Sequence, residues 1–400
     1  MIAKIIKCKA FIALAAFVLL SAVAAAVQLW QTAPNNYPYH SWTSWAIDDF
    51  VAQKQAPNMV FMGSSLMLVP LDGVDADFYG KKVDGAAHHN SKYFEESFGK
   101  ATGVPVSTYN FALPGEMPSD AYLITKLILS QSKKPDAIVF GVGPRDFMDN
   151  LLPSAAATDP YRFLTRFVNV APVANLAMPG WSERFNYELG RANYFYGNRT
   201  DICTLFTQFT GSAINGLVPK AKRMDPALVH QLIPEYKPFA LEKEQAFFRP
   251  LTGAELASFT DNLEEYRKRY KTLNMATFRT QMEFMSRAMQ TAKQQGVHVV
   301  LVAMPITDLN RELISDSAWS LYHESVKKLA SNCGATLVDF SESSCFNRKD
   351  FGDTVHLHAR GGRKFLDLLT ERLVDDSQLL GALRQNRNAV ELAGKNGGQL

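Results

Sequence analysis

Short apolar stretches recur along the chain, separated by segments in which the apolar residues follow helical spacing. Five of these stretches are almost continuously apolar, at residues 59–62, 106–111, 137–142, 299–304 and 336–340. Strands of a parallel sheet have this composition, because helices cover both of their faces. Strands that alternate with helices in this way predict an α/β fold with a central parallel five-stranded sheet.

Helix positions follow from caps and from apolar residues spaced three or four apart. A short amphipathic helix is predicted near residues 44–53, and Thr252 with Glu255 has the pattern of a capping box. Apolar stripes predict two longer helices packed on the sheet, the second of them after the Gly-Gly pair at 361–362. The stripes consist of Phe278, Met282, Met285 and Met289, and of Phe365, Leu368, Leu369 and Leu373.

The N-terminus has the pattern of an export signal. Three lysines, at positions 4, 7 and 9, precede a run that is apolar from residue 10 to residue 27 except for Ser21. Because basic residues stay on the cytoplasmic side, the rest of the chain is expected outside the cytoplasmic membrane, in the periplasm or beyond. Residues 1–30 are interpreted as an uncleaved, single-pass anchor in the inner membrane. A cleaved signal peptide is the alternative, since the small residues around Ala24 resemble cleavage sites.

The regular alternation stops between about residues 150 and 250. This stretch, rich in proline and aromatic residues, is interpreted as a large irregular or helical insertion in a main domain at 57–375. Its aromatic residues either form a small core of their own, line a substrate groove or rest on the membrane surface. They include Trp181, Phe185, Tyr187, Tyr194 and Tyr196. Residues 31–56 predict a linker and a short helix, and residues 376–400 a flexible polar tail.

Charge and residue content argue against several kinds of partner. The 42 basic and 39 acidic side chains give a net charge of +3 without a basic stripe, so nucleic acid is not an expected partner. His88 and His89 lack metal-ligand neighbours and are expected in a solvated loop, and no Gly-rich phosphate loop follows a strand. No metal or cofactor is therefore predicted. Cys333 and Cys345 either form a disulfide or stay as buried thiols.

Two motifs near opposite ends of the chain carry candidate catalytic residues. A Gly-Ser-Ser sequence ending at Ser65 follows the first strand, at the edge where open α/β sheets bind ligands. Asp353 and His356 are three residues apart, so the carboxylate can accept a hydrogen bond from Nδ1 and leave Nε2 as an acceptor. A serine nucleophile needs such a base and a third group that orients it. His358 is expected at the surface, and the alternative is that it shapes the pocket.

These motifs, in this order around five α/β repeats, resemble the SGNH hydrolases, also called the GDSL-like family. The sequence Gly-Ser-Ser-Leu at 63–66 matches the family's Gly-Asp-Ser-Leu and makes Ser65 the nucleophile, and Asp-x-x-His-Leu matches at Asp353 and His356. The resemblance implies a three-layer α/β/α, flavodoxin-like sandwich.

The expected oxyanion hole matches the family only in part. Gly115 is similar to the family's second-block glycine, whose N–H binds the oxyanion. The third block departs, because Arg145 stands where the family has asparagine. Arg145 either donates to the oxyanion in its place or forms a structural ion pair with Asp146 or another acidic group.

The N-terminal anchor, the Gly-Ser-Ser motif and the insertion resemble a membrane-anchored subset of this family, the DltD-like and alginate O-acetylation proteins. The resemblance implies a membrane-tethered serine esterase or O-acyltransferase that acts on acyl, by expectation acetyl, esters of a cell-envelope or extracellular polysaccharide. Expected partners are that polysaccharide or another acylated envelope substrate, and a membrane-bound O-acyltransferase. A catalytically inactive scaffold subunit of a polysaccharide-modification complex is the alternative, because the third block is altered.

Overall fold

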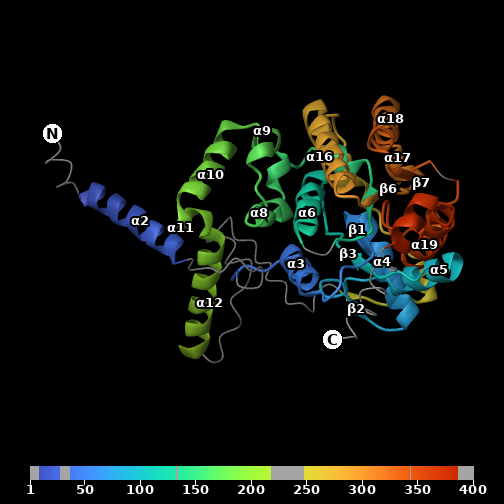
Figure 1. Cartoon of the computed structure of the whole chain (residues 1–400), viewed down its shortest axis with the longest axis horizontal. Coiled ribbons are helices and arrows are strands. Elements are labelled where there is room, and N and C mark those ends of the chain that lie inside the picture. The colour runs from blue at the N-terminus through green and yellow to red at the C-terminus, as the bar shows by residue number, and fades with distance from the viewer. Residues whose placement is uncertain (1–8, 28–36, 132–133, 218–246, 343, 386–400) are drawn as a thin grey trace, which may run out of the picture. The chain divides into compact units, whose positions relative to one another are not determined.

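The computed structural model describes residues 9–27, 37–131, 134–217, 247–342 and 344–385 (Figure 1). Contacts divide the chain into two compact units. The first comprises Met1–Asp48 and Pro172–Glu242, and the second comprises Asp49–Ala171 and Lys243–Leu400. All of the candidate catalytic residues belong to the second unit.

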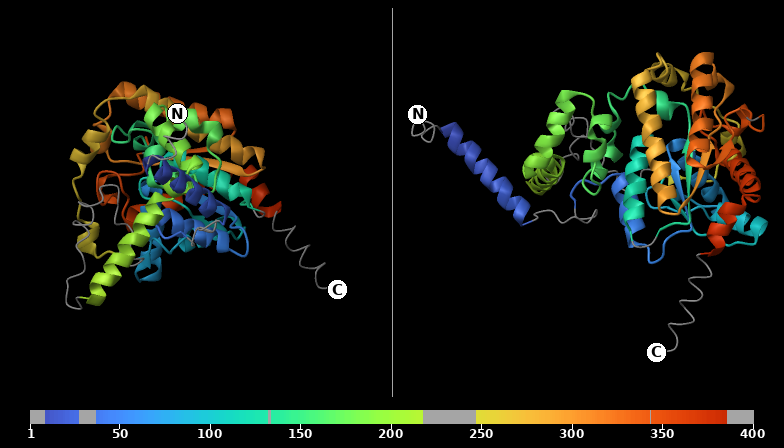
Figure 2. Two further views of the ribbon diagram at one scale, coloured as in Figure 1. Left: turned by 90° about the vertical axis from the view of Figure 1, so that its left-hand side faces the viewer. Right: turned by 45° about the horizontal axis from the view of Figure 1, so that its top comes forward.

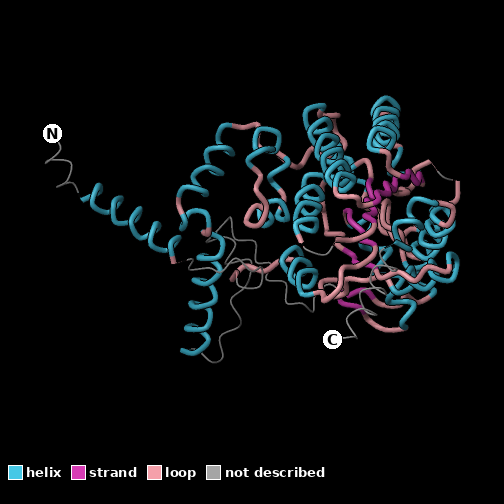
Figure 3. The backbone as a smooth tube through the Cα atoms, viewed as in Figure 1, coloured by secondary structure: helices cyan, strands magenta, loops and turns pink. Residues whose placement is uncertain are grey.

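A five-stranded parallel sheet forms the centre of the second unit (Figure 3). Its strands are β1 (Met59–Gly63), β3 (Thr108–Asn110), β4 (Ala137–Val142), β6 (His298–Ala303) and β7 (Thr336–Asp339). They lie in the order β3-β1-β4-β6-β7, which is the flavodoxin-like order. All five predicted strands are present, and their ends differ from the predicted ones by at most two residues.

Helices cover both faces of this sheet (Figure 2). One layer contains α4 (Ser65–Tyr79), α5 (Lys92–Thr102) and α19 (Ala359–Leu373), which pack against one another. The other layer contains α6 (Pro118–Ser130), α16 (Met275–Gln294) and α18 (Asp316–Cys333), with α16 between the other two. The predicted three-layer α/β/α class is therefore confirmed.

The two long predicted helices bury nearly the expected stripes. In α16, Phe284 is buried where Met282 was expected, and in α19, Leu366 is buried where Leu368 was expected. The other residues of both stripes are buried as predicted. The buried arc is wider than a single stripe because each helix contacts neighbouring helices as well as the sheet.

Several short elements complete the second unit. The predicted capping box of Thr252 and Glu255 is present, but it begins only a single turn, α14 (Gly253–Leu256). A two-residue antiparallel pair, β2 (Val83–Asp84) with β5 (Phe247–Phe248), was not predicted, because such short strands have no recognisable pattern. The remaining helices are α7 (Arg145–Met148), α8 (Asp159–Leu164), α15 (Leu263–Arg269) and α17 (Asp308–Arg311), with 3₁₀ turns at Ala155–Ala157 and Arg348–Asp350.

The first unit is helical. It contains α2 (Lys9–Ala26), α9 (Ala174–Ala177), α10 (Trp181–Ala192), α11 (Tyr194–Gly197) and α12 (Arg199–Leu217), and α3 (Trp42–Ala52), the helix predicted at 44–53, begins in it. Among the described residues, α2 alone is long and apolar enough to cross a membrane, and only 11% of it is buried. The predicted anchor is thus a single apolar helix near the N-terminus.

The aromatic residues of the insertion do not form a core in α10. Trp181 is 82% exposed and Phe185 is 60% exposed, and no residue of α10 is buried. A core of their own is therefore the wrong interpretation for these two side chains. Tyr187, Tyr194 and Tyr196 are half-buried.

The tail and the cysteines differ from what was expected or left open. Residues 377–385 are helical and bury Leu379 and Leu383, so the part of the predicted flexible tail that can be described is packed. Residues 386–400 lie outside the described part of the chain. Within the described residues no disulfide joins Cys333 to Cys345, and Cys333 is a buried thiol.

Candidate active site

The candidate nucleophile lies where strand β1 meets helix α4. Gly63 ends the strand with φ of +143°, and a Cβ there would lie 2.4 Å from the carbonyl oxygen of Gly141 on β4. Only glycine fits such an approach. The chain then turns so that Ser64 is buried and Ser65, the first residue of α4, is partly exposed. Because the first N–H groups of a helix lack intrahelical acceptors, that of Ser65 can bind an anion.

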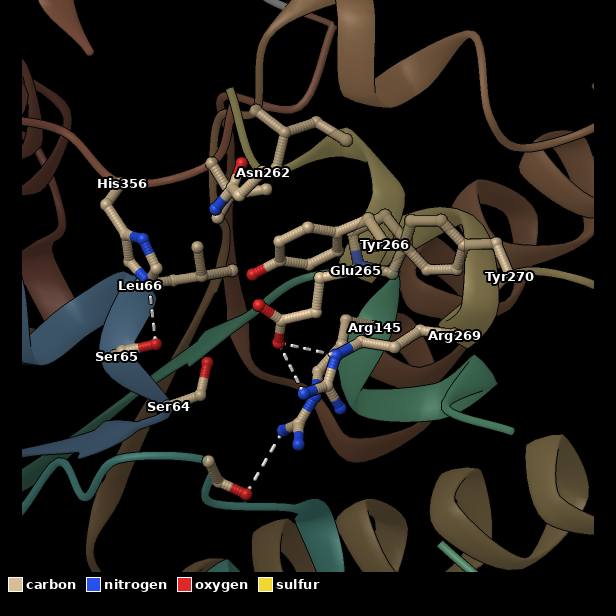
Figure 4. Close-up of a pocket in the computed structure, with 14 residues that line it drawn as sticks. Ser64, Ser65, Leu66, Arg145, Asn262, Glu265, Tyr266, Arg269, Tyr270 and His356 are labelled. Atoms are coloured by element: carbon tan, nitrogen blue, oxygen red, sulfur yellow. Dashed lines mark hydrogen bonds and ion pairs between the residues drawn. The ribbon is translucent and has the colours of Figure 1, made fainter. Parts of the chain in front are cut away.

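The candidate base and its orienting carboxylate lie in the loop before α19. Asp353 Oδ1 accepts hydrogen bonds from the backbone N–H groups of Val355 and His356, both 2.8 Å long. Asp353 Oδ2 lies 2.7 Å from His356 Nδ1. His356 Nε2 lies 2.8 Å from Ser65 Oγ, the bond that Figure 4 marks between these two side chains. The structure thus brings Ser65, His356 and Asp353 into one hydrogen-bonded row across 291 residues of sequence.

The electrostatics of Asp353 suit a group that holds an imidazolium. Partial burial alone would raise the pKa of this carboxyl group, but the hydrogen bond from the His356 ring and those from two backbone N–H groups outweigh it. The pKa of Asp353 is therefore lowered from its ordinary value, and the group is ionised at neutral pH.

A network around Thr354 fixes the position of this loop. Thr354 Oγ1 donates to Asn262 Oδ1 and accepts from Asn310 Nδ2 at 3.1 Å, and its carbonyl oxygen accepts from Thr307 Oγ1 at 2.7 Å. Thr354 is fully buried. The network restrains the backbone between Asp353 and His356, and sequence reasoning did not find its members.

Two helices that pack unusually closely set the distance between Ser65 and the His356 loop. A Cβ at Gly362 of α19 would lie 3.0 Å from Cα and Cβ of Pro70 in α4, and 2.9 Å from Val74. Gly73 of α4 in turn faces the backbone of α19. Ser65 is the first residue of α4, and the loop that contains His356 leads directly into α19. The contact between these two helices therefore fixes how close Ser65 and His356 lie.

Gly115 and Arg145 also lie at this pocket. Gly115 has φ of +75°, which places its loop in a conformation that favours glycine. Arg145 Nη1 donates to the Gly115 carbonyl oxygen at 3.1 Å, while Arg145 Nε lies 3.0 Å from Asp149 and Nη1 lies 3.6 Å from Asp146. The ion pair expected as one of two roles for Arg145 is therefore present, and the same side chain holds the Gly115 loop.

Three carboxyl groups near Arg145 are fully buried, and their desolvation dominates their electrostatics. Burial raises the pKa of Glu116 well above its ordinary value, that of Asp120 to about 7 and that of Asp146 to about 6. Asp120 accepts hydrogen bonds from Thr158 Oγ1 at 2.5 Å and from a backbone N–H, which oppose the increase only in part.

Four of the predicted residues, Ser65, Gly115, Arg145 and His356, line a pocket of about 220 Å³. Besides the predicted residues, its walls include Asn262 and one side of α15 with the residue after it, where Glu265, Tyr266, Arg269 and Tyr270 are found. Arg269 forms an ion pair with Glu265 (Figure 4). It forms a second ion pair with the buried Asp149. Sequence reasoning missed this wall, because a segment with so many charged residues resembles a solvated surface helix.

Three histidines of secondary interest are more ordered than expected. His88 Nε2 lies 2.8 Å from Asp75, and the His89 ring stacks on Tyr109, so neither residue sits in a merely solvated loop. His358 is buried rather than at the surface. It caps α19 by accepting from the Gly361 N–H, and its other ring nitrogen bonds to the Lys349 carbonyl. No cluster of three or more potential metal ligands occurs among the described residues.

Comparisons with known proteins are distant. A family model without a functional description matches residues 242–378. No curated protein matches the sequence. Thirteen chains of solved structures match. One of them is a catalytic mutant of an acetylxylan esterase from Geobacillus stearothermophilus, with 10% sequence identity and a TM-score of 0.34 over 80% of this chain and 95% of that one. Fold and chemistry therefore rest on this chain's own residues.

Proposed function

We propose that the second unit is a serine esterase or O-acyltransferase of the SGNH type. One observation carries this proposal: a row of hydrogen bonds joins Asp353 to His356 at 2.7 Å and His356 to Ser65 at 2.8 Å. Nucleophile, base and orienting acid in this geometry are what acyl transfer to a serine requires. The short motifs around Ser65, Gly115 and His356 resemble those of the SGNH family in the same order.

In the proposed reaction, His356 Nε2 removes the proton of Ser65 as Oγ attacks the ester carbonyl carbon. Asp353 keeps the proton of the imidazole on Nδ1 and stabilises the imidazolium that forms. The backbone N–H groups of Ser65 and Gly115 bind the oxyanion of the tetrahedral intermediate. As the intermediate collapses, His356 returns the proton to the leaving oxygen, which releases an alcohol and leaves an acyl-serine.

The second half of the reaction decides between esterase and transferase. Water or a sugar hydroxyl attacks the acyl-serine, His356 removes its proton, and Ser65 is regenerated with release of the acid or the new ester. A pocket of about 220 Å³ fits an acetyl group with part of a sugar ring. Tyr266 and Asn262 in its wall are of the kind that contacts carbohydrate faces and hydroxyls.

The role proposed for Arg145 is to position the Gly115 loop. Its side chain donates to the carbonyl oxygen of Gly115 while Asp149 holds its other end. The permanent positive charge also favours a nearby oxyanion. This arrangement compensates for the asparagine that the family has at this position.

The setting proposed for this chemistry is the outer side of the cytoplasmic membrane, with α2 as the tether. The helix is long and apolar enough to cross once. The substrate proposed is an acetylated cell-envelope or extracellular polysaccharide, and a membrane-bound O-acyltransferase is the proposed partner that supplies acyl groups. An inactive scaffold is the competing proposal, favoured by the loss of the family's third-block asparagine.

The test uses the full-length protein in detergent with a fluorophosphonate probe and an activated acetyl ester. We expect stoichiometric labelling of Ser65 and release of acetate, both abolished in Ser65→Ala. Ser64→Ala is the matched control, because this adjacent serine is buried and should be dispensable for labelling. Labelling of neither serine, with no acetate released, would favour the scaffold.

A competition experiment separates the two enzymatic outcomes. Adding oligosaccharides of increasing length to the activated ester should divert acetyl groups from water to sugar if the protein is a transferase. Mass spectrometry of the sugars then reads the ratio of transfer to hydrolysis directly. An unchanged rate of acetate release at saturating sugar would identify an esterase.

A further inference from the structure

The first unit exposes several large apolar side chains to solvent. On α10, Trp181 and Phe185 are four residues apart and point to one side of the helix, with 82% and 60% of their surfaces exposed. On α12, Phe206 and Phe209 are 63% and 73% exposed, and Leu205 lies beside them. Aromatic residues that gather on one side of a helix mark a surface meant for a partner or a membrane.

The same unit packs directly against the helix that is apolar enough to cross a membrane. Helix α11 lies beside α2 (Figure 1). The backbone N–H of Tyr194 in α11 donates to Ser21 Oγ of α2 at 2.7 Å, and the Phe195 ring lies 5.8 Å from that of Phe17. Ser21 and Ala24 are the buried residues of α2. After Lys9, the remaining residues of α2 are exposed and apolar, as a lipid-facing helix requires.

The position of this contact along α2 decides what surrounds α11. At about 1.5 Å per residue, the 18 residues of α2 extend about 27 Å, close to the thickness of a hydrocarbon core. Ser21 is about 7 Å from the end at Ala26, which is the end away from the basic N-terminal flank. A segment that bonds to Ser21 therefore lies at the depth of the outer leaflet whenever α2 spans the bilayer.

We infer that α10, α11 and α12 form a membrane-docking element that enters the outer leaflet beside α2 through Trp181, Phe185, Phe206 and Phe209. The occupant of this surface is lipid, at the boundary between headgroups and acyl chains. Aromatic residues are enriched at this depth, because a ring is apolar while its surroundings are partly polar. The inference rests on the proposed function only in that α2 crosses the membrane.

The consequence for the first unit is attachment at two places, a crossing helix and an interfacial group of helices. A single helix with a linker would leave the exported part free to tilt away from the surface. Helices that enter the leaflet beside it instead hold the first unit at the membrane.

The test measures tryptophan quenching in the full-length protein, reconstituted alone into phosphatidylethanolamine–phosphatidylglycerol vesicles that contain acyl-chain-brominated lipid. Comparing wild type with Trp181→Phe isolates the emission of Trp181, and the other tryptophans contribute equally to both proteins. Trp319→Phe is the matched control, because Trp319 is buried in the second unit and bonds to Glu342.

We expect the emission that Trp181→Phe removes to be quenched severalfold more strongly by brominated lipid than the emission that Trp319→Phe removes. Emission of Trp181 that is unaffected by brominated lipid but quenched by aqueous iodide would overturn the inference. The inference would also be overturned if brominated lipid quenched Trp181 only at low protein-to-lipid ratios. A second copy of the protein, and not lipid, would then cover this surface at higher ratios.

The failure of the tether is recognised separately. Protein that does not float with the vesicles shows that α2 does not anchor the chain, and the proposed location fails with it. Protein that floats, while Trp181 stays in contact with water, overturns the docking element alone. Neither outcome depends on the activity of Ser65.

Discussion

Asp353→Asn is the substitution that most directly tests the proposed chemistry. In the native protein, Oδ1 of Asp353 accepts from the N–H groups of Val355 and His356, and Oδ2 accepts from His356 Nδ1. An asparagine must place its amide oxygen toward the two backbone donors, since an NH₂ group there would leave both without an acceptor. The NH₂ group then faces Nδ1 and forces it to accept.

The consequence of that geometry is the wrong tautomer of His356. With Nδ1 as acceptor, the ring carries its proton on Nε2, which lies 2.8 Å from Ser65 Oγ. Nε2 can then no longer remove the proton of the serine hydroxyl. In serine enzymes this defect lowers kcat by about 10⁴-fold, equivalent to about 5.5 kcal/mol of transition-state stabilisation.

The assay is hydrolysis of an activated acetyl ester, with the rate of fluorophosphonate labelling as a second readout. Asp339→Asn is the matched control, because Asp339 lies 2.6 Å from His323 in an Asp–His pair that does not line the pocket. The control should keep activity within about twofold. Should Asp353→Asn stay within about tenfold of the wild type while Ser65→Ala is inactive, the tautomer argument would be refuted.

Three further substitutions test the surroundings of the site. Arg145→Ala should lower kcat by about tenfold to a hundredfold, because the Gly115 loop loses its restraint. The same substitution should lower the unfolding free energy by about 3 kcal/mol. An unchanged kcat would contradict the positioning role of Arg145. Because burial raises the pKa of Asp120 to about 7, the stability it contributes is complete below about pH 4 and is lost as the pH rises through 7. Urea unfolding measures how far the unfolding free energy falls between about pH 5 and about pH 8. In Asp120→Asn this fall should be smaller than in the wild type by about 3 kcal/mol. An equal fall in both proteins would show that the Asp120 carboxyl group does not titrate in this range. Gly362→Ala should push α19 away from Pro70, and so lower kcat and lower the unfolding free energy by about 1–3 kcal/mol. Thermal melting measures the stability and ester hydrolysis measures kcat. Wild-type values of both would mean that the helix contact can relax around the added methyl group.

The sheet could be predicted because its strands have the simplest pattern in the chain. Residues 137–142 are buried in full, follow Asp136 and end before Gly143 and Pro144, so composition alone locates the strand. The motifs of Ser65 and of His356 could be found for a related reason. Each directly follows or precedes a predicted element, and the order of strands in such folds brings the ends of those elements to one edge.

The rest of the pocket could not be found in this way, because its residues have no local signal. Tyr266 and Arg269 belong to a helical turn whose charged residues resemble those of any exposed helix. Asn262 contributes through a bond to Thr354, 92 residues away. The role of Arg145 depends on which of several acids lies beside it, and only tertiary structure decides that.

Because α4 and α19 are in close contact, the three catalytic side chains alone would not reproduce the geometry of this site in another protein. A protein engineer who copied Ser65, Asp353 and His356 onto another scaffold would also need the glycines that let the two helices approach, above all Gly362. Relatives with a bulkier residue at that position would need a compensating smaller one on the facing helix. The pair of helices α4 and α19 must therefore be kept together with the catalytic residues.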